Sequence, residues 1–95
     1  MSNPEELQAI RQRIDLIDAQ LVPLLVQRID LALQALLHKR TEEEIRGCDR
    51  VRLVLDKAAA RADKAGGHSD TVVAIYRNIV HELTELQLRT REARA

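Results

Sequence analysis

The sequence predicts an all-α protein with three helices per chain, one long, one short and one of medium length. Three observations support this fold class. Apolar residues recur at steps of three and four over three segments, which is the period of an amphipathic helix. No segment alternates apolar and polar residues as a half-buried strand would. Aromatic residues make up 1% of a chain that is 45% hydrophobic, so the core must be built from aliphatic side chains.

Length and composition limit the possible functions. A chain of 95 residues is expected to form a single domain, residues 1–95, with a modest core. Fifteen basic and fifteen acidic residues give no net charge, which argues against nucleic acid or an anionic membrane as a partner. The polar N-terminus and the lack of a long apolar run predict a cytoplasmic protein. Cys48 is a lone cysteine without metal-ligand spacing, so no metal site is expected.

The first helix is expected at about residues 5–39. Pro4 and the acidic residues after it favour a helix start. At ~1.5 Å per residue this helix is roughly 50 Å long, more than the rest of the chain can cover. A second copy of the chain is the simplest cover, so we expect a homodimer. Pro23 removes one backbone hydrogen bond and predicts a bend near residues 19–23 without a break.

A loop is expected at residues 40–48, followed by the short second helix. The segment "RTEEEIRGC" interrupts the apolar period with charge and with Gly47. Asp49 is of a type that favours the N-cap position, where its side chain accepts a backbone hydrogen bond. The second helix is therefore predicted at about residues 49–65.

The third helix is predicted at about residues 70–92, after a glycine turn. Gly66 and Gly67 suit the left-handed backbone that ends many helices. Ser69 or Asp70 is expected to cap the helix that follows. The apolar period then continues before the chain ends in a charged tail.

Several cations lie beside the apolar stripe of the first helix. Arg28 and Lys39 are eleven residues apart, which returns to nearly the same face of a helix. Arg11 lies seventeen residues before Arg28, or roughly 26 Å away along a straight helix. An antiparallel pair of first helices would bring Arg11 of one chain toward Arg28 and Lys39 of the other. Arg50 and Gln87 are positioned to complete such a pocket, which would suit a small compound with two carboxylates.

The same cations also have an ordinary structural explanation. An arginine beside an apolar stripe commonly lays its stem along the surface and keeps its charge in water. Asp15, Asp18 and Asp30 are available for ordinary salt bridges on the same helix. From the residue spacing alone, a ligand pocket and a solvated helix face both remain open.

Two segments of the sequence resemble a known enzyme family. The stretch "LQAIRQRIDLIDAQLVPLLVQRIDLALQALLHK" resembles the first helix of the all-helical (AroQ) class of chorismate mutases. The matching positions are Arg11, Ile14, Asp15, Ile17, Asp18, Leu21, Leu24, Leu25, Arg28 and Lys39. The stretch "VVAIYRNIVHELTELQ" is similar to the closing helix of the family, which ends on a catalytic glutamine or glutamate, here Gln87. The resemblance covers about residues 7–88.

The resemblance implies a fold, a reaction and a set of roles. Members of the family are intertwined helical dimers that rearrange chorismate to prephenate without a cofactor, in the shikimate pathway toward aromatic amino acids. By resemblance, Arg11 of the partner chain and Arg28 bind the substrate carboxylates, and Arg50 supports that carboxylate site. Lys39 and Gln87 donate hydrogen bonds to the ether oxygen that is released as the bond breaks.

Two positions depart from the pattern of the family. Val51 stands where many members have an acid that contacts the ring hydroxyl of chorismate, and Leu83 stands where some have a polar residue. Related isochorismate pyruvate lyases also carry an apolar residue at the position of Val51. The alternatives are therefore a pyruvate lyase, a mutase for an analogue such as 4-amino-4-deoxychorismate, or a helical dimerisation module without activity.

Overall fold

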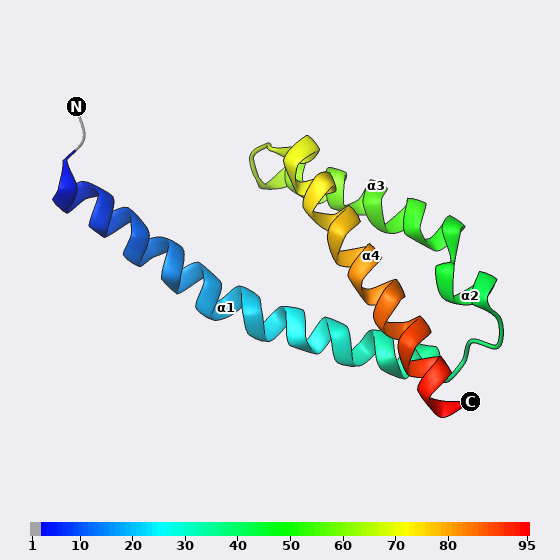
Figure 1. Ribbon diagram of the computed structural model, residues 1–95. Coiled ribbons are helices and arrows are strands. Elements are labelled where there is room, and N and C mark those ends of the chain that lie inside the picture. Colours follow the sequence, from blue (N-terminus) through cyan, green and yellow to red (C-terminus); the bar gives the residue numbers. More distant parts are fainter. Residues whose placement is uncertain (1–2) are drawn as a thin grey trace. The chain divides into compact units, whose positions relative to one another are not determined.

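The computed structural model describes residues 3–95, which form helices and short connections without a strand (Figure 1). The helices are α1 (Pro4–Leu36), α2 (Glu42–Arg46), α3 (Cys48–Ala65) and α4 (Ser69–Arg94). The prediction of an all-α fold with a long, a short and a medium helix is confirmed. The one addition is α2, a single turn of helix.

The start of α1 has a side-chain cap that the sequence analysis did not assign. Asn3 Oδ1 accepts hydrogen bonds from the backbone N–H of Glu5 at 2.9 Å and of Glu6 at 3.3 Å. These two N–H groups have no partner within the helix, and Asn3 satisfies them. Pro4 then takes the first helical position, as predicted.

The end of α1 differs from the prediction. The helix continues through Pro23, as expected for a bend without a break, but it stops at Leu36 instead of residue 39. The next three residues form tighter turns, in which each backbone N–H bonds to the carbonyl three residues before; the last is Lys39 to Leu36 at 3.0 Å. Lys39 therefore lies in a turn and not on the helix itself.

The predicted loop at residues 40–48 contains α2. Thr41 Oγ1 accepts from the backbone N–H of Glu44 at 3.1 Å, so Thr41 is the N-cap. Gly47 ends α2 in the left-handed conformation, with φ of 46°. It also precedes the first residue of α3, Cys48. The prediction that Asp49 caps α3 is wrong, because α3 begins one residue earlier and Gly47 occupies the cap position.

The turn between α3 and α4 has three successive residues with positive φ. Gly66 and Gly67 have φ of 121° and 127°, which confirms their predicted role in ending the helix. His68 follows with φ of 62° and is the N-cap of α4 without a side-chain hydrogen bond. The prediction that Ser69 or Asp70 caps this helix is wrong, since α4 already begins at Ser69.

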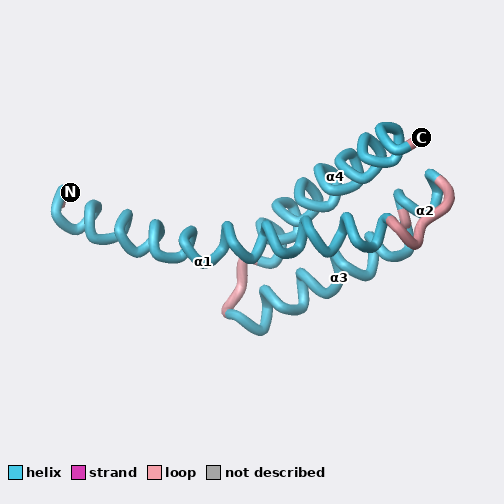
Figure 2. Tube along the Cα trace, turned by 90° about the horizontal axis from the view of Figure 1, so that it is seen from below, coloured by secondary structure: helices cyan, strands magenta, loops and turns pink. Residues whose placement is uncertain are grey.

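The chain divides into two compact units, residues 1–31 and residues 32–95. In the second unit α3 and α4 pack along each other, and α2 packs on α4 (Figures 1 and 2). Its small core contains apolar residues from each helical segment of the unit. They are Leu36, Ile45, Ala58, Ala62 and Leu83.

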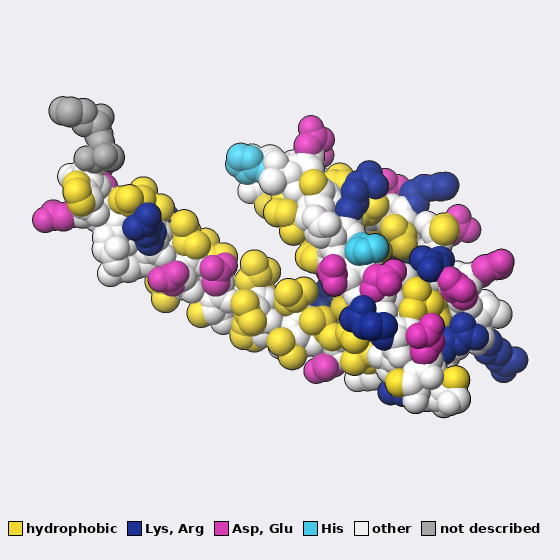
Figure 3. Space-filling model, in the orientation of Figure 1, with side chains coloured by type: hydrophobic (Ala, Val, Ile, Leu, Met, Phe, Trp, Pro, Cys, Tyr) yellow, Lys and Arg dark blue, Asp and Glu magenta, His cyan; other side chains and the backbone are white. Residues whose placement is uncertain are grey.

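The described part of the first unit is the N-terminal portion of α1, and none of residues 3–31 is buried. Its exposed large apolar side chains range from 43% (Leu7) to 68% (Leu16) exposed, whereas Leu25 and Ile29 are half-buried; Figure 3 shows apolar side chains along the helix. The stripe of Ile10, Ile14, Ile17 and Leu21 continues the three- and four-residue steps seen in the sequence. No helix in the described part of the chain has the length and apolar character of a membrane span.

Candidate active site

Gln87 is a buried polar side chain in the core of the second unit. It is only 5% exposed and lies on α4, one turn after the buried Leu83. A polar group in such a position must find hydrogen-bond partners inside the protein, because leaving it unpaired costs ~1–3 kcal/mol. The hydrogen-bond partners of Gln87 therefore show which polar groups this part of the core brings together.

Both ends of the Gln87 amide are bonded. Nε2 donates to the backbone carbonyl of Ala32 at 2.7 Å, and Oε1 accepts from Lys39 Nζ at 3.4 Å. The carbonyl can only accept and the ammonium can only donate, so this pair of partners fixes which way the amide points. Lys39 and Ala32, which lie 48 and 55 positions before Gln87 in the sequence, are thereby joined to one side chain of α4.

The Lys39 side chain is half-buried and reaches Gln87 from the turn that follows α1. Its ammonium has three N–H donors, and a contact of 3.4 Å to Gln87 leaves the others directed elsewhere. Gln87 Nε2 has a second N–H besides the one bonded to Ala32. A cationic donor and a neutral donor thus belong to two side chains that contact each other, and preorganised donors of both kinds can stabilise negative charge on an oxygen atom.

The other residues predicted for the second unit lie near helix ends or beside this pair. Arg50 and Val51 are in the first turn of α3; Arg50 is exposed and Val51 is half-buried. Leu83 provides a buried apolar neighbour one turn before Gln87. The structure therefore brings Lys39 and Gln87 together, while the proximity of Arg50 and Val51 to them stays a prediction.

The remaining two cations belong to the first unit. Arg11 is exposed and Arg28 is half-buried. Arg28 has an interaction partner within the chain. That these two arginines face the Lys39–Gln87 pair, and that Arg11 does so from a partner chain, stays a prediction.

The structure adds residues around Lys39 that the sequence analysis missed. The backbone N–H of Arg40 donates to Glu44 Oε2 at 2.7 Å, and Arg91 Nη2 donates to the carbonyl of Arg40 at 3.0 Å. The pattern Thr41-x-x-Glu44 is a capping-box signature that could have revealed α2 and Glu44. The Ala32 carbonyl has no such signal, because every residue carries a backbone carbonyl.

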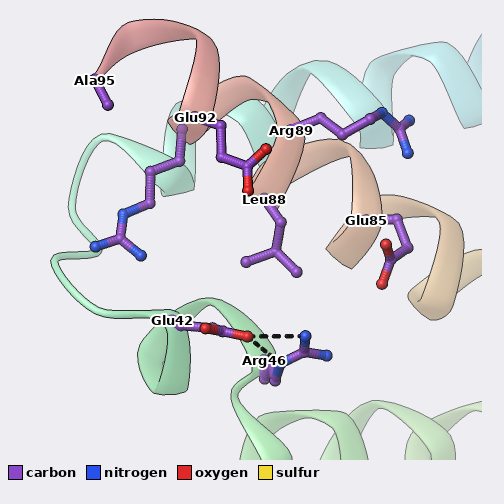
Figure 4. A pocket seen from close by; sticks show the side chains of 8 residues that line it. Glu42, Arg46, Glu85, Leu88, Arg89, Glu92 and Ala95 are labelled. Atoms are coloured by element: carbon purple, nitrogen blue, oxygen red, sulfur yellow. Dashed lines mark hydrogen bonds and ion pairs between the residues drawn. The ribbon is translucent and has the colours of Figure 1, made fainter.

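A hollow of about 470 Å³ lies between α2 and the end of α4 (Figure 4). Leu88 points from α4 toward the ion pair between Glu42 and Arg46, whose atoms are 2.9 Å apart. The wall carries three acidic and three basic side chains. The lining consists of Glu42, Arg46, Glu85, Leu88, Arg89, Arg91, Glu92 and Ala95.

The family model described as chorismate mutase type II matches residues 10–88, which is most of the chain. The chain belongs to this family. A search of curated proteins gives no significant match.

The family match confirms the resemblance seen in the sequence and supports an activity of the chorismate mutase type. Its range contains Lys39 and Gln87, which are 48 positions apart in the sequence and meet in the structure. It also contains the two positions at which this chain departs from the pattern, Val51 and Leu83.

Proposed function

We propose that this chorismate mutase type II chain converts chorismate to prephenate in a homodimer with shared active sites. In this proposal the reaction is the step of the shikimate pathway toward aromatic amino acids and takes place in the cytoplasm. The reaction is a Claisen rearrangement: the ether C–O bond breaks while a new C–C bond forms in the same molecule. No atom leaves and no redox partner is needed.

The observation that carries the proposal is the contact between Lys39 and Gln87. As the ether bond breaks, negative charge develops on its oxygen, and preorganised donors stabilise that charge. The Lys39 ammonium and the second N–H of Gln87 are two such donors, and the buried position of Gln87 lowers competition from water. The Ala32 carbonyl holds the amide in place before the substrate arrives.

The substrate carboxylates are assigned to the arginines. Arg28 and Arg11 of the partner chain bind the two carboxylates in the compact reactive conformer of the dianion, and Arg50 supports them. The dimer is supported by the exposed apolar stripe on residues 3–31, which a second copy of the same helix would cover. A site built from two chains also accounts for the long sequence separation between Arg11 and Lys39.

A second candidate function rests on Val51. Its half-buried apolar side chain gives no acceptor for the ring hydroxyl of chorismate. The same cationic pocket would then serve isochorismate, with elimination of pyruvate, or an analogue such as 4-amino-4-deoxychorismate. Both substrates are dicarboxylates that differ from chorismate in the ring substituents; isochorismate would lose pyruvate by elimination, and the amino analogue would rearrange as chorismate does.

The products distinguish these functions. The purified protein is incubated separately with chorismate, isochorismate and 4-amino-4-deoxychorismate, and the products are identified. Prephenate from chorismate supports the main proposal, while salicylate plus pyruvate from isochorismate supports the second candidate. If none of the three substrates is consumed, the chain is a helical dimerisation module and the proposal fails.

The substitution Val51→Glu tests the ring substituent directly. If chorismate is the substrate, the new carboxylate accepts from the ring hydroxyl and KM for chorismate falls with little change in kcat. For a substrate without that hydroxyl within reach, the change introduces an unpaired charge and KM rises. Val51→Gln is the matched control, because it adds similar volume without charge. Equal loss of activity with all three substrates would show that Val51 does not line the pocket.

A further inference from the structure

Lys39 lies just beyond α1, at the last of the tighter turns that follow this helix, where its N–H bonds to the Leu36 carbonyl. α1 ends at Leu36, and α2 begins at Glu42. Lysine also has a flexible four-carbon stem, so its ammonium is placed well only if the backbone beneath it is fixed. What holds residues 37–41 is therefore important for any role of Lys39 in the reaction.

We propose that Glu44 and Arg91 are positioning residues for Lys39. They bind the two polar groups of the next residue, Arg40: Glu44 accepts from its N–H at 2.7 Å, and Arg91 donates to its carbonyl at 3.0 Å. We call this pair of hydrogen bonds the Arg40 clasp. The inference rests on the proposed function, in which Lys39 acts on the reacting ether oxygen.

The Arg91 half of the clasp comes from the same helix as Gln87. The two residues are four positions apart on α4, so they lie on one face of the helix, one turn from each other. α4 therefore contacts the Lys39 segment twice, once at the Lys39 ammonium through Gln87 and once at the Arg40 carbonyl through Arg91. Movement of α4 would shift both contacts together.

The Glu44 half comes from the first turn of α2. Its own backbone N–H is bonded to Thr41 Oγ1 at 3.1 Å, which fixes the turn that carries the carboxylate. The bond from Arg40 N–H to the carboxylate has an ionised acceptor and is short, so it is stronger than a bond between neutral groups. The Lys39 segment is thus held by α2, which follows it in the sequence, as well as by the end of α1, which precedes it.

Both bonds of the clasp are exposed, which determines what their loss should change. An exposed hydrogen bond contributes little to global stability because water replaces it. Catalysis is more sensitive, since a shift of ~1 Å in a catalytic group can cost ~10² in rate. Loss of the clasp should therefore lower kcat while the fold is retained.

The first test compares Arg91→Ala with two related variants. We expect Arg91→Ala to lower kcat for chorismate about tenfold with KM changed less than about twofold, because Lys39 acts mainly in the transition state. Arg91→Lys keeps a donor and should recover part of the loss. The matched control is Arg89→Ala, which removes an arginine from the same helix and the same hollow. An equal loss in Arg89→Ala would overturn the assignment.

The Glu44 half is tested with an isosteric pair. Glu44→Gln keeps an oxygen acceptor for the Arg40 N–H and should retain most of kcat, whereas Glu44→Ala should lose about as much as Arg91→Ala. Arg91→Ala is then combined with Lys39→Gln. Because Arg91 acts through Lys39, it should have little further effect in that background. Equal fold-losses in both backgrounds would overturn the proposal.

Hydrogen exchange separates failure of the clasp from failure of the proposed function. If wild-type protein converts no chorismate, the proposed function is wrong, but the clasp can still be measured at the Arg40 amide. We expect this amide to exchange about tenfold faster in Glu44→Ala than in Glu44→Gln, because only the first lacks the acceptor. Equal exchange in wild-type, Glu44→Ala and Arg91→Ala proteins would show that the clasp does not hold the segment.

Discussion

Gln87 carries two N–H donors and one acceptor oxygen at a buried position, and the protein itself uses most of this hydrogen-bonding capacity. One N–H is bonded to Ala32 and the oxygen faces Lys39, which leaves a single N–H for a ligand. Lys39 has two further donors beside it. The geometry therefore gives the ammonium the larger share of any charge stabilisation and the amide the smaller share.

This division predicts a ranking of alanine substitutions. Lys39→Ala should lower kcat by at least ~10²–10³, the typical cost of removing one preorganised donor. Gln87→Ala should lose somewhat less, and Arg28→Ala should impair both KM and kcat because it is assigned to the substrate carboxylate. Steady-state kinetics give the ranking, and circular dichroism confirms that helical content is retained. Near-native turnover in Lys39→Ala would remove Lys39 from the ether oxygen.

The neutral amide of Gln87 also predicts the pH dependence. An amide does not titrate, so wild-type kcat should be flat from about pH 6 to 8. Gln87→Glu introduces a carboxyl whose ordinary pKa is about 4.3. In the variant we expect burial and the facing Ala32 carbonyl to raise the pKa of this carboxyl, with the Lys39 ammonium opposing the shift. Only the protonated form can donate.

The variant should therefore be most active at low pH and lose activity as pH rises, by more than about tenfold between pH 5 and 8. The measurement is kcat for wild type and Gln87→Glu across that range, with Gln87→Ala as the control that cannot titrate. A flat profile in Gln87→Glu would contradict the hydrogen-bond arrangement around the amide.

Helix ends show where sequence reasoning was reliable and where it was not. The apolar period identified the three main helices because it continues over many turns in each of them. The ends depend on one or two hydrogen bonds, and several candidates competed for them. Asp49 is a good N-cap type, yet Thr41 and Glu44 formed a turn upstream and Gly47 became the junction. Residues that favour a helix cap could be recognised in the sequence, but the sequence did not show which of them would form the cap.

The candidate site, like the helix ends, could be predicted only in part from the sequence. The spacing of polar residues and the resemblance singled out Lys39 and Gln87, which the structure brings into contact. The Ala32 carbonyl and the Arg40 clasp were not predictable, because they depend on where the backbone ends of α1 and α2 meet α4. Backbone groups are identical in every residue, so only the fold can select one.

The α3–α4 turn gives a prediction about stability. Gly67 has φ of 127°, and a Cβ placed there would meet nothing within 4 Å. Gly67→Ala should nevertheless destabilise the protein by about 1–2 kcal/mol, because the strain is in the backbone and not in a clash. His68→Gly should be neutral or stabilising by up to about 1 kcal/mol, since it relieves a left-handed residue with a side chain.

These free energies of unfolding are measured by chemical denaturation at one fixed protein concentration, so that any association contributes equally. Gly67→Ala should lower the free energy of unfolding, whereas His68→Gly should leave it unchanged or raise it. If Gly67→Ala is as stable as wild type, the glycine turn is not required in its left-handed form.

At the scale of the whole molecule, residues 3–31 and residues 32–95 differ in how they bury apolar surface. The second unit has its own small core, while the described part of the first has no buried residue. An apolar helix stripe of this length is more exposed than monomeric proteins usually tolerate. The proposed dimer covers this stripe and brings Arg11 into the site of the partner.

Mixing two inactive variants tests the shared site. Arg11→Ala and Lys39→Ala proteins, unfolded and refolded together in equal amounts, should recover about a quarter of wild-type activity, because half the dimers are mixed and each has one intact site. Each variant refolded alone is the control. Sedimentation of the wild type at micromolar concentration should show a dimer. A fully active monomer would contradict both the dimer and the trans role of Arg11.

The short connection between α3 and α4 also has a consequence for how the chain acquires its fold. Only Gly66, Gly67 and His68 separate these two helices, and most of the contacts between helical elements join them. Contacts between segments that are close along the chain form early, because little loop-closure entropy opposes them. The helical hairpin is thus expected to be the first structured part of a nascent chain. If the proposed dimer forms, the long N-terminal helix, which is synthesised before the hairpin, has its apolar face covered only when a partner chain binds. Newly made chains would then depend on protein concentration to complete folding, and the N-terminal helix would be their most aggregation-prone segment during that interval.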